Sequence, residues 1–196
     1  MASPDYGAYL HGDVALERKY IIRNRLVELA EMRKPCDVLD VGCGRGLVAI
    51  AFALNSPRHK VYAMDVWNQD EIAGNSPEWV LKNAKLEGVS NVTAGQGDAR
   101  NIPFRAEAFD VVVSNLVIHN LPIDDQLQAF SEMKRVLRPG GLLLYSDVDE
   151  NGQFNRVREF LLALEFQGTR FYRILTFPKE PPVSVCALVA IKPSET

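Results

Sequence analysis

The glycines at positions 42, 44 and 46 form the segment of this sequence best suited to bind a ligand. They follow the apolar run Val38-Leu-Asp-Val41, which reads as a buried strand (37–41), and an apolar helix is expected from Leu47. Glycine lets the backbone pass close beneath a ligand, and a helix start presents backbone N–H groups toward it. The dinucleotide fingerprint Gly-x-Gly-x-x-Gly would place its third glycine at Leu47. The turn therefore predicts a nucleotide-like ligand without specifying a pyrophosphate.

Polar side chains are expected at the ends of three further strands, at the same sheet edge as the glycine turn: Asp65, Asp98 and Asn115. Asp65, about twenty residues beyond the turn, can accept hydrogen bonds from both hydroxyls of a ribose. Asp98 can accept one from an exocyclic amine such as that of adenine, and the apolar Val66 and Trp67 could cover one face of the ring. Either carboxylate alone is equally consistent with a solvated loop. Together, behind a glycine turn, they favour a nucleoside site.

Strand and helix patterns alternate along the chain and end in two β-rich runs with no room for a helix between them. This order predicts an α/β three-layer sandwich with a terminal antiparallel hairpin. One domain is expected over residues 1–196, with an N-terminal helix or lid in 1–35 and a core in 36–192. The expected helices are 14–33, 47–54, 76–87, 123–137 and 153–166, and the expected strands are 37–41, 60–64, 91–96, 109–114, 142–146, 170–177 and 183–191.

Composition favours an ordinary soluble globular protein over a nucleic-acid-binding or membrane protein. Apolar residues make up 47% of the 196 residues, and the net charge is −3. Basic residues are scattered, so no nucleic-acid partner is expected, and no apolar stretch is long enough to span a bilayer. The N-terminal residues do not read as a secretory signal. Cys36, Cys43 and Cys186 show neither zinc-ligand spacing nor a disulfide framework, which predicts buried reduced thiols in a cytoplasmic protein.

Five segments of the sequence together resemble the class I S-adenosylmethionine-dependent methyltransferases: 38–46, 64–66, 97–104, 109–115 and 135–141. The resemblance runs from about residue 36 to residue 192. It implies a seven-stranded, mostly parallel, doubly wound sheet in which only the last strand runs antiparallel to its neighbours. It also implies S-adenosyl-L-methionine as the cofactor.

Carried over by position, the resemblance assigns contacts to the cofactor. The loop from Gly42 to Gly46, together with Asp40, would hold the methionine moiety, and Cys43 within it is expected to be a small filler. Asp65 would bind the ribose hydroxyls, flanked by Val66 and Trp67. The remaining contacts would be made to adenine by Asp98 and Ala99, and near the transferred methyl by Asn115 and Leu116.

The acceptor side of the site is less determined. His119 is the best candidate for a general base, because it follows the fourth strand and imidazole titrates near neutral pH; packing against the next helix is the alternative. Tyr6 and Tyr9 are candidates for a lid over the substrate, or belong to a disordered terminus. Asp147 begins an acidic run that either binds a cationic acceptor or is a solvated loop. His11 and His59 are expected at the surface. No metal site is expected.

The absence of certain motifs narrows the range of methyl acceptors to consider. Residues 114–117 read Ser-Asn-Leu-Val and lack the Asn/Asp-Pro-Pro-aromatic motif of amino-methylating nucleic-acid and glutamine enzymes. They also lack the Pro-Cys of cytosine C5 enzymes. A small-molecule acceptor is the leading hypothesis, for a monomer or homodimer. The alternatives are a protein-methylating enzyme of the same fold, a non-catalytic partner subunit, and a nicotinamide oxidoreductase, which the glycine spacing disfavours.

Overall fold

The computed structural model describes residues 4–6, 16–68, 75–149, 152–178 and 182–194. Seven strands form one sheet in the order β3-β2-β1-β4-β5-β7-β6. The first five strands pair in parallel, and β7 runs antiparallel to both its neighbours. This confirms the predicted topology. The strands are β1 (Asp37–Val41), β2 (Lys60–Asp65), β3 (Val92–Gln96), β4 (Phe109–Asn115), β5 (Leu137–Val148), β6 (Gln167–Phe177) and β7 (Val183–Ile191).

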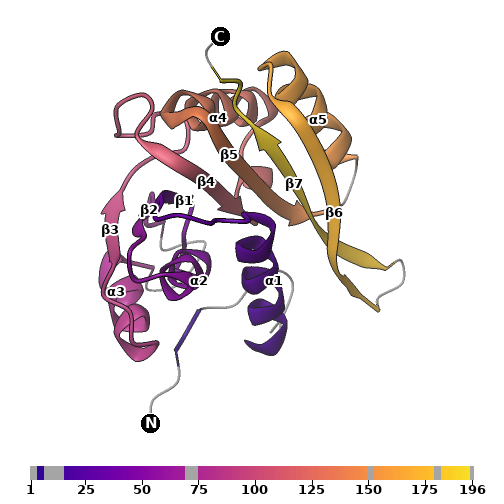
Figure 1. Ribbon diagram of the computed structural model, residues 1–196. Helices are drawn as coiled ribbons and strands as arrows, with labels where there is room; N and C mark the ends of the chain where they lie inside the picture. Colours follow the sequence, from indigo (N-terminus) through magenta and orange to yellow (C-terminus); the bar gives the residue numbers. More distant parts are fainter. Residues whose placement is uncertain (1–3, 7–15, 69–74, 150–151, 179–181, 195–196) are drawn as a thin grey trace.

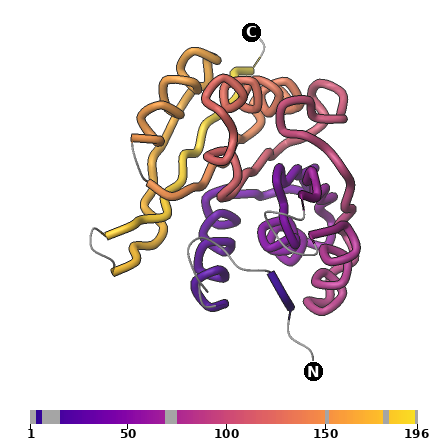
Figure 2. The backbone as a smooth tube through the Cα atoms, turned by 180° about the vertical axis from the view of Figure 1, so that it is seen from behind, coloured from indigo at the N-terminus to yellow at the C-terminus, as the bar shows by residue number. Residues whose placement is uncertain are grey.

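Helices cover both faces of the sheet and make three layers. In Figure 1, α1, α2 and α3 lie below the strands and α4 and α5 lie above them, and the view from behind in Figure 2 shows the same division. A short 3-10 helix, η1, follows β4. The bounds are α1 (Leu16–Leu29), α2 (Leu47–Asn55), α3 (Pro77–Leu86), η1 (Ile118–Asn120), α4 (Ile123–Val136) and α5 (Gln153–Ala163).

Two hydrophobic clusters, one on each face, hold the layers together. The first packs α1, α2 and α3 against the sheet, and the second packs α4 and α5 against the opposite face. Neighbouring residues of one strand contribute to opposite clusters, as Val38 and Leu39 of β1 do. The central strands are therefore apolar on both faces, which is typical of parallel strands covered by helices. Polar residues on these strands lie toward their ends, and those at the carboxyl ends are close to the candidate site.

The predicted elements are all present, with bounds shifted by a few residues. The largest difference is β5, expected over 142–146, which runs from Leu137 to Val148. Its carboxyl end continues because Asp147 and Val148 pair with Cys186 and Val185 of β7. Asp147 is therefore a strand residue.

His59 is buried, with 3% of its surface exposed, which corrects the expectation of a surface position. Its Nδ1 accepts a hydrogen bond from the Cys36 backbone N–H at 3.0 Å, and its Nε2 lies 3.1 Å from Asn55 Oδ1. The ring joins the start of β1 to the end of α2. Cys36, Cys43 and Cys186 are buried and not bonded to one another, as predicted.

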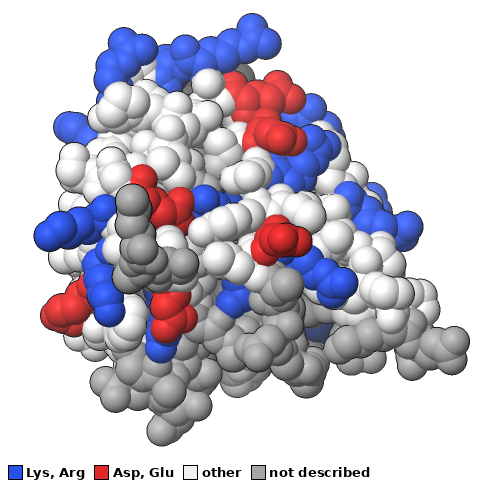
Figure 3. Space-filling model, turned by 90° about the horizontal axis from the view of Figure 1, so that it is seen from below, with Lys and Arg blue, Asp and Glu red and all other residues white. Residues whose placement is uncertain are grey.

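The expectations about nucleic-acid, membrane and metal partners can be compared with the surface charge and the helices that the structure describes. On the face seen from below in Figure 3, coloured acidic and basic side chains are interspersed. Within the part of the chain that the structure describes, no helix has the length and apolarity needed to cross a membrane. No group of three His, Cys, Asp or Glu residues there could hold a metal ion. The absence of a nucleic-acid partner stays a prediction.

Candidate active site

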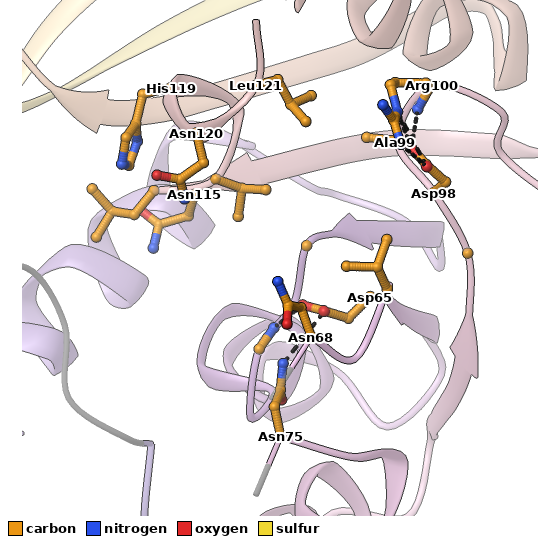
Figure 4. A pocket seen from close by; sticks show the side chains of 16 residues that line it. Asp65, Asn68, Asn75, Asp98, Ala99, Arg100, Asn115, His119, Asn120 and Leu121 are labelled. Atoms are coloured by element: carbon orange, nitrogen blue, oxygen red, sulfur yellow. Dashed lines mark hydrogen bonds and ion pairs between the residues drawn. The ribbon is translucent and has the colours of Figure 1, made fainter. Parts of the chain in front are cut away.

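A cavity of about 670 Å³ lies at the carboxyl ends of the parallel strands. Its walls come from the glycine turn after β1, the residues after β2 and β3, and the segment between β4 and α4. Figure 4 shows the labelled side chains from these segments around one space. The predicted residues in its lining are Gly42, Gly44, Asp65, Val66, Asp98, Ala99, Asn115, Leu116 and His119.

The glycine turn is held by the end of β2. The N–H groups of Gly42 and Cys43 donate to the Met64 carbonyl oxygen at 2.7 and 3.0 Å. Gly42 has φ +72°, and a Cβ there would lie 2.5 Å from the γ carbons of Val117. At Gly46, with φ +86°, a Cβ would lie 2.9 Å from Val80. Glycine is thus required at both positions by the protein's own packing, whereas the sequence suggested only a close ligand.

Asp65 joins the glycine turn to the segment after β2. Its Oδ2 accepts a hydrogen bond from the Gly44 N–H at 2.9 Å, and its Oδ1 accepts one from the Trp67 N–H at 2.9 Å. The Asn75 side-chain amide donates to Oδ1 at 3.3 Å. These donors fix the carboxylate at the cavity wall.

Asp40, Cys43 and Gly46 are not among the described residues that line the cavity. Asp40 is buried and accepts the Ala49 N–H at 2.9 Å, so it stabilises the first turn of α2. Burial raises the pKa of Asp40 to about 7. Burial also raises the pKa of the Cys43 thiol well above its ordinary value, which fits the small filler that we expected. These residues support the turn from behind.

Asp98 lines the cavity as an ionised acceptor. The Arg100 guanidinium lies 2.6 Å from its Oδ2 and holds the pKa of Asp98 below its usual range. Arg100 also pairs with Asp125 of α4 at 2.8 Å. Two carboxylates therefore position the arginine, which the sequence analysis did not identify as a lining residue.

Asn115, at the end of β4, is 4% exposed and points toward the cavity in Figure 4. Neither its Oδ1 nor its Nδ2 has a hydrogen-bond partner among the described residues. Buried amides without partners are costly, so this side chain is suited to a polar ligand. Leu116 follows with φ +60°, and its N–H donates to the Ser146 carbonyl oxygen at 2.8 Å. The left-handed backbone conformation of Leu116 turns the chain where it lines the cavity.

His119 and Asp147 form a pair at the other end of the cavity. His119 of η1 lines the cavity, and its Nδ1 lies 2.8 Å from Asp147 Oδ1. Asp147 is fully buried and is not part of the described lining, so neither a solvated loop nor contact with a cationic acceptor describes this residue. Asp149, two residues further along, is exposed. The carboxylate is a neighbour of the histidine within the fold.

Two aromatic residues, Tyr6 and Trp67, lie elsewhere than expected. Tyr6 is 2% exposed and its hydroxyl donates to Glu87, beside Arg23, so among described residues it belongs to the N-terminal packing and not to the cavity lining. Tyr9 lies outside the described residues. Trp67, with φ +58°, packs against the hydrophobic cluster of α1, α2 and α3, while Val66 lines the cavity.

Sequence reasoning missed several lining residues. Asn68, Asn75 and Asn120 bring amide side chains, and Val117 and Leu121 bring apolar ones. The asparagines stand in polar connections, where this residue type is common in turns and gives no specific signal. The orphaned amide of Asn115, the carboxylates Asp65 and Asp98, and a cavity of about 670 Å³ fit a ligand with an adenosine and an amino-acid part.

Comparison with known proteins identifies the family. The sequence pattern of the methyltransferase domain family matches residues 39–145. The chain is similar to the demethylmenaquinone methyltransferase of Staphylococcus aureus, with 32% identity over 137 residues. That alignment covers 69% of this chain and 52% of the relative, so the chain spans about half the length of the curated relatives it matches.

Solved structures share the fold. The [4+2]-cyclase SpnF has a TM-score of 0.76 at 18% identity, covering 98% of this chain and 89% of that one. Phosphoethanolamine N-methyltransferase 2 of Haemonchus contortus, in complex with S-adenosyl-L-methionine, has a TM-score of 0.69 at 18% identity. The match covers 92% of this chain and 53% of that one. The chain therefore belongs to the methyltransferase domain family and has the class I methyltransferase fold, whose cofactor is S-adenosylmethionine.

Proposed function

We propose that this protein transfers a methyl group from S-adenosylmethionine to a small-molecule acceptor. The observation that carries the proposal is the single cavity at which Asp65, Asp98, Asn115 and His119 meet. Asp65, Asp98 and Asn115 suit the ribose, the adenine and the methionine part of the cofactor. His119 is a base, which binding of the cofactor does not require. A site for binding alone would have no use for it.

Each proposed cofactor contact is supported by one side chain of the cavity wall. Asp65 would accept the ribose hydroxyls, since its carboxylate is fixed at the wall by Gly44. Asp98, with Ala99, would accept the adenine amine. Asn115 would bind polar groups of the methionine part through its two orphaned atoms.

The bound cofactor supplies a methyl group that is already activated by its sulfonium. The protein therefore has to hold the acceptor in line with that methyl and exclude water, which is worth several kcal/mol through orientation alone. His119 would take the proton that the acceptor loses. Its place in the cavity lining gives it access to the acceptor.

The alternatives are a protein acceptor and a non-catalytic partner subunit. A cavity of about 670 Å³ is compatible in size with the cofactor and a small acceptor. The Staphylococcus aureus relative is named for a small-molecule acceptor, demethylmenaquinone. SpnF is named a [4+2]-cyclase, so the fold by itself does not establish methyl transfer and the reaction has to be measured.

Calorimetric titration of the full chain tests the cofactor site. S-adenosylmethionine and its demethylated product should each bind saturably, and NAD should not. If folded protein binds neither sulfur ligand, the proposed function is wrong.

Transfer itself can be followed with methyl-labelled S-adenosylmethionine and a cell extract separated into small-molecule and protein fractions. Label should appear in the small-molecule fraction. The His119→Ala variant should retain cofactor binding and lose transfer. Label confined to protein would support the protein-methylating alternative, and no label in either fraction would support the non-catalytic one.

A further inference from the structure

The carboxylate of Asp147 lies in a network of donors between the sheet and the cavity wall. Its Oδ1 accepts the Val148 N–H at 2.8 Å and faces His119 Nδ1 at 2.8 Å. Its Oδ2 accepts the Tyr145 hydroxyl at 2.9 Å. Asp147 itself is fully buried, whereas 25% of the His119 side chain is exposed. The pair therefore runs from the interior to the surface of the cavity.

The direction of each hydrogen bond in this network can be assigned. The Gln153 amide donates to the Tyr145 oxygen, which leaves the phenol hydrogen for Asp147. Burial and the nearby carboxylate raise the pKa of Tyr145, so the phenol keeps this hydrogen. Tyr145 and Val148 thus each donate to one oxygen of Asp147, and the carboxylate acts as an acceptor toward both. Nδ1 of His119 lies 2.8 Å from Oδ1, a separation at which a ring lone pair would be repelled by the carboxylate, so the ring hydrogen is expected on Nδ1.

We propose that Asp147 is a positioning residue that holds His119 in the Nδ1–H tautomer, with Nε2 as a proton acceptor for the reaction. This inference rests on the proposed function. In a neutral imidazole with hydrogen on Nδ1, the lone pair is on Nε2. A buried carboxylate that orients a histidine through Nδ1 is a recurring way to prepare a general base.

The chemical consequence concerns the acceptor. As the bond from the accepting atom to the methyl carbon forms, the methyl–sulfur bond breaks and sulfur keeps its electron pair. The proton of the accepting atom passes to Nε2, which leaves the acceptor neutral and His119 as an imidazolium beside the Asp147 carboxylate. The pair thus suits an acceptor whose accepting atom carries a proton, as a hydroxyl or phenol does.

A purely structural role for Asp147 predicts a different protonation of the His119 ring. If Asp147 only stabilised η1, the histidine would be free to take either tautomer, or to remain an imidazolium in an ion pair. Burying a carboxylate costs several kcal/mol unless its partners offset it. The distinguishing property is therefore the protonation of the two ring nitrogens, which can be measured without knowing the acceptor.

Nitrogen NMR of the full chain with 15N-labelled histidine rings provides the test. His119→Gln assigns the ring, and His59 serves as an internal reference of the opposite tautomer, since its Nδ1 accepts the Cys36 N–H. At neutral pH we expect His119 to be protonated on Nδ1 alone and His59 on Nε2 alone. In Asp147→Asn the tautomer ratio of His119 should shift by about tenfold or more toward Nε2–H, since a charged hydrogen-bond acceptor is lost.

Asp149→Asn is the matched control, because Asp149 is exposed and lies two residues further along. It should leave both rings unchanged. A wild-type His119 found as Nε2–H or as imidazolium, or a tautomer that Asp147→Asn does not shift, would overturn the proposal. If Asp147→Asn does not fold, the wild-type spectrum alone decides, because only the Nδ1–H tautomer of His119 is compatible with the proposal. Calorimetry with S-adenosylhomocysteine on the same samples tests the proposed function separately.

Discussion

The backbone N–H of Gly44 donates to Asp65 Oδ2 at 2.9 Å, so the carboxylate at the end of β2 also holds the glycine turn after β1. Two walls of the cavity are thereby fixed to each other before any ligand binds. A site organised in this way loses little conformational entropy on binding. Changes at Asp65 should affect the turn as well as the ribose.

Replacement of Asp65 tests that double role. Asp65→Ala should weaken binding of both S-adenosylmethionine and S-adenosylhomocysteine by about 2 kcal/mol, the scale of charge-assisted hydrogen bonds lost from a shielded site. Isothermal titration gives the affinities, with Asp149→Ala as the exposed control. Equal affinity in wild type and variant would place the ribose elsewhere.

Glycine 42 should be sensitive to substitution for two separable reasons. Gly42→Ala adds left-handed strain and a Cβ that would lie 2.5 Å from Val117, so we expect a loss of about 3 kcal/mol in unfolding free energy. Gly88 has φ +75° with nothing within 4 Å of its Cβ position, so Gly88→Ala should cost only about 1 kcal/mol. Denaturant melts of both variants measure the difference, and equal losses would mean that Val117 gives way.

The buried acid Asp40 should make stability depend on pH. Folded Asp40 keeps its proton up to about pH 7, whereas the ordinary value is 3.8, so the folded state binds more protons between these values. Its contribution therefore falls as pH rises, by up to about 1.4 kcal/mol per pH unit in that window.

Asp40→Asn keeps an acceptor for the Ala49 N–H and removes the titration. Its unfolding free energy relative to wild type should rise steadily from about pH 4 to about pH 7. Denaturant melts across the range measure it. A difference that stays constant with pH would show that Asp40 is ionised throughout.

The ion pair between Arg23 of α1 and Glu87 should contribute strongly to stability. The two guanidinium nitrogens lie 2.6 and 2.7 Å from the carboxylate oxygens, with side chains only 8% and 12% exposed. Glu87→Gln leaves a buried charge without compensation, and about 3 kcal/mol of unfolding free energy should be lost.

The exposed pair Arg25–Glu28 provides the matched control, with side chains 44% and 62% exposed. Glu28→Gln should change stability by less than about 0.5 kcal/mol. Similar effects of the two substitutions would mean that Glu87 is solvated in solution.

The positions of the strands along the chain and the cofactor edge could be predicted because their signals are local. The apolar run before the glycine turn and the β-rich run ending at Asn115 each contain their own boundary. The family resemblance then implied the number of strands and the antiparallel direction of the last one. No local signal marked the end of β5, because Asp147 is polar and follows an apolar strand; only its pairing with Cys186 of β7 places it inside the sheet.

The remaining differences arise from contacts between distant residues. His59 is buried because it caps a backbone N–H on β1, and Tyr6 because it reaches Glu87, 81 residues away in sequence. Neither contact leaves a periodic pattern around the residue. Trp67 depends on a positive φ in a connection whose path no motif predicts.

The two faces of the sheet carry different parts of the cavity edge. Tyr145 belongs to the cluster with α4 and α5, and by strand alternation Asp147 projects from the same face. Asn115 and its register partner Ser146, whose hydroxyl has no partner among the described residues, project from the face of α1 and α2. Substitutions that reshape the second face can thus leave the histidine anchor on the first intact.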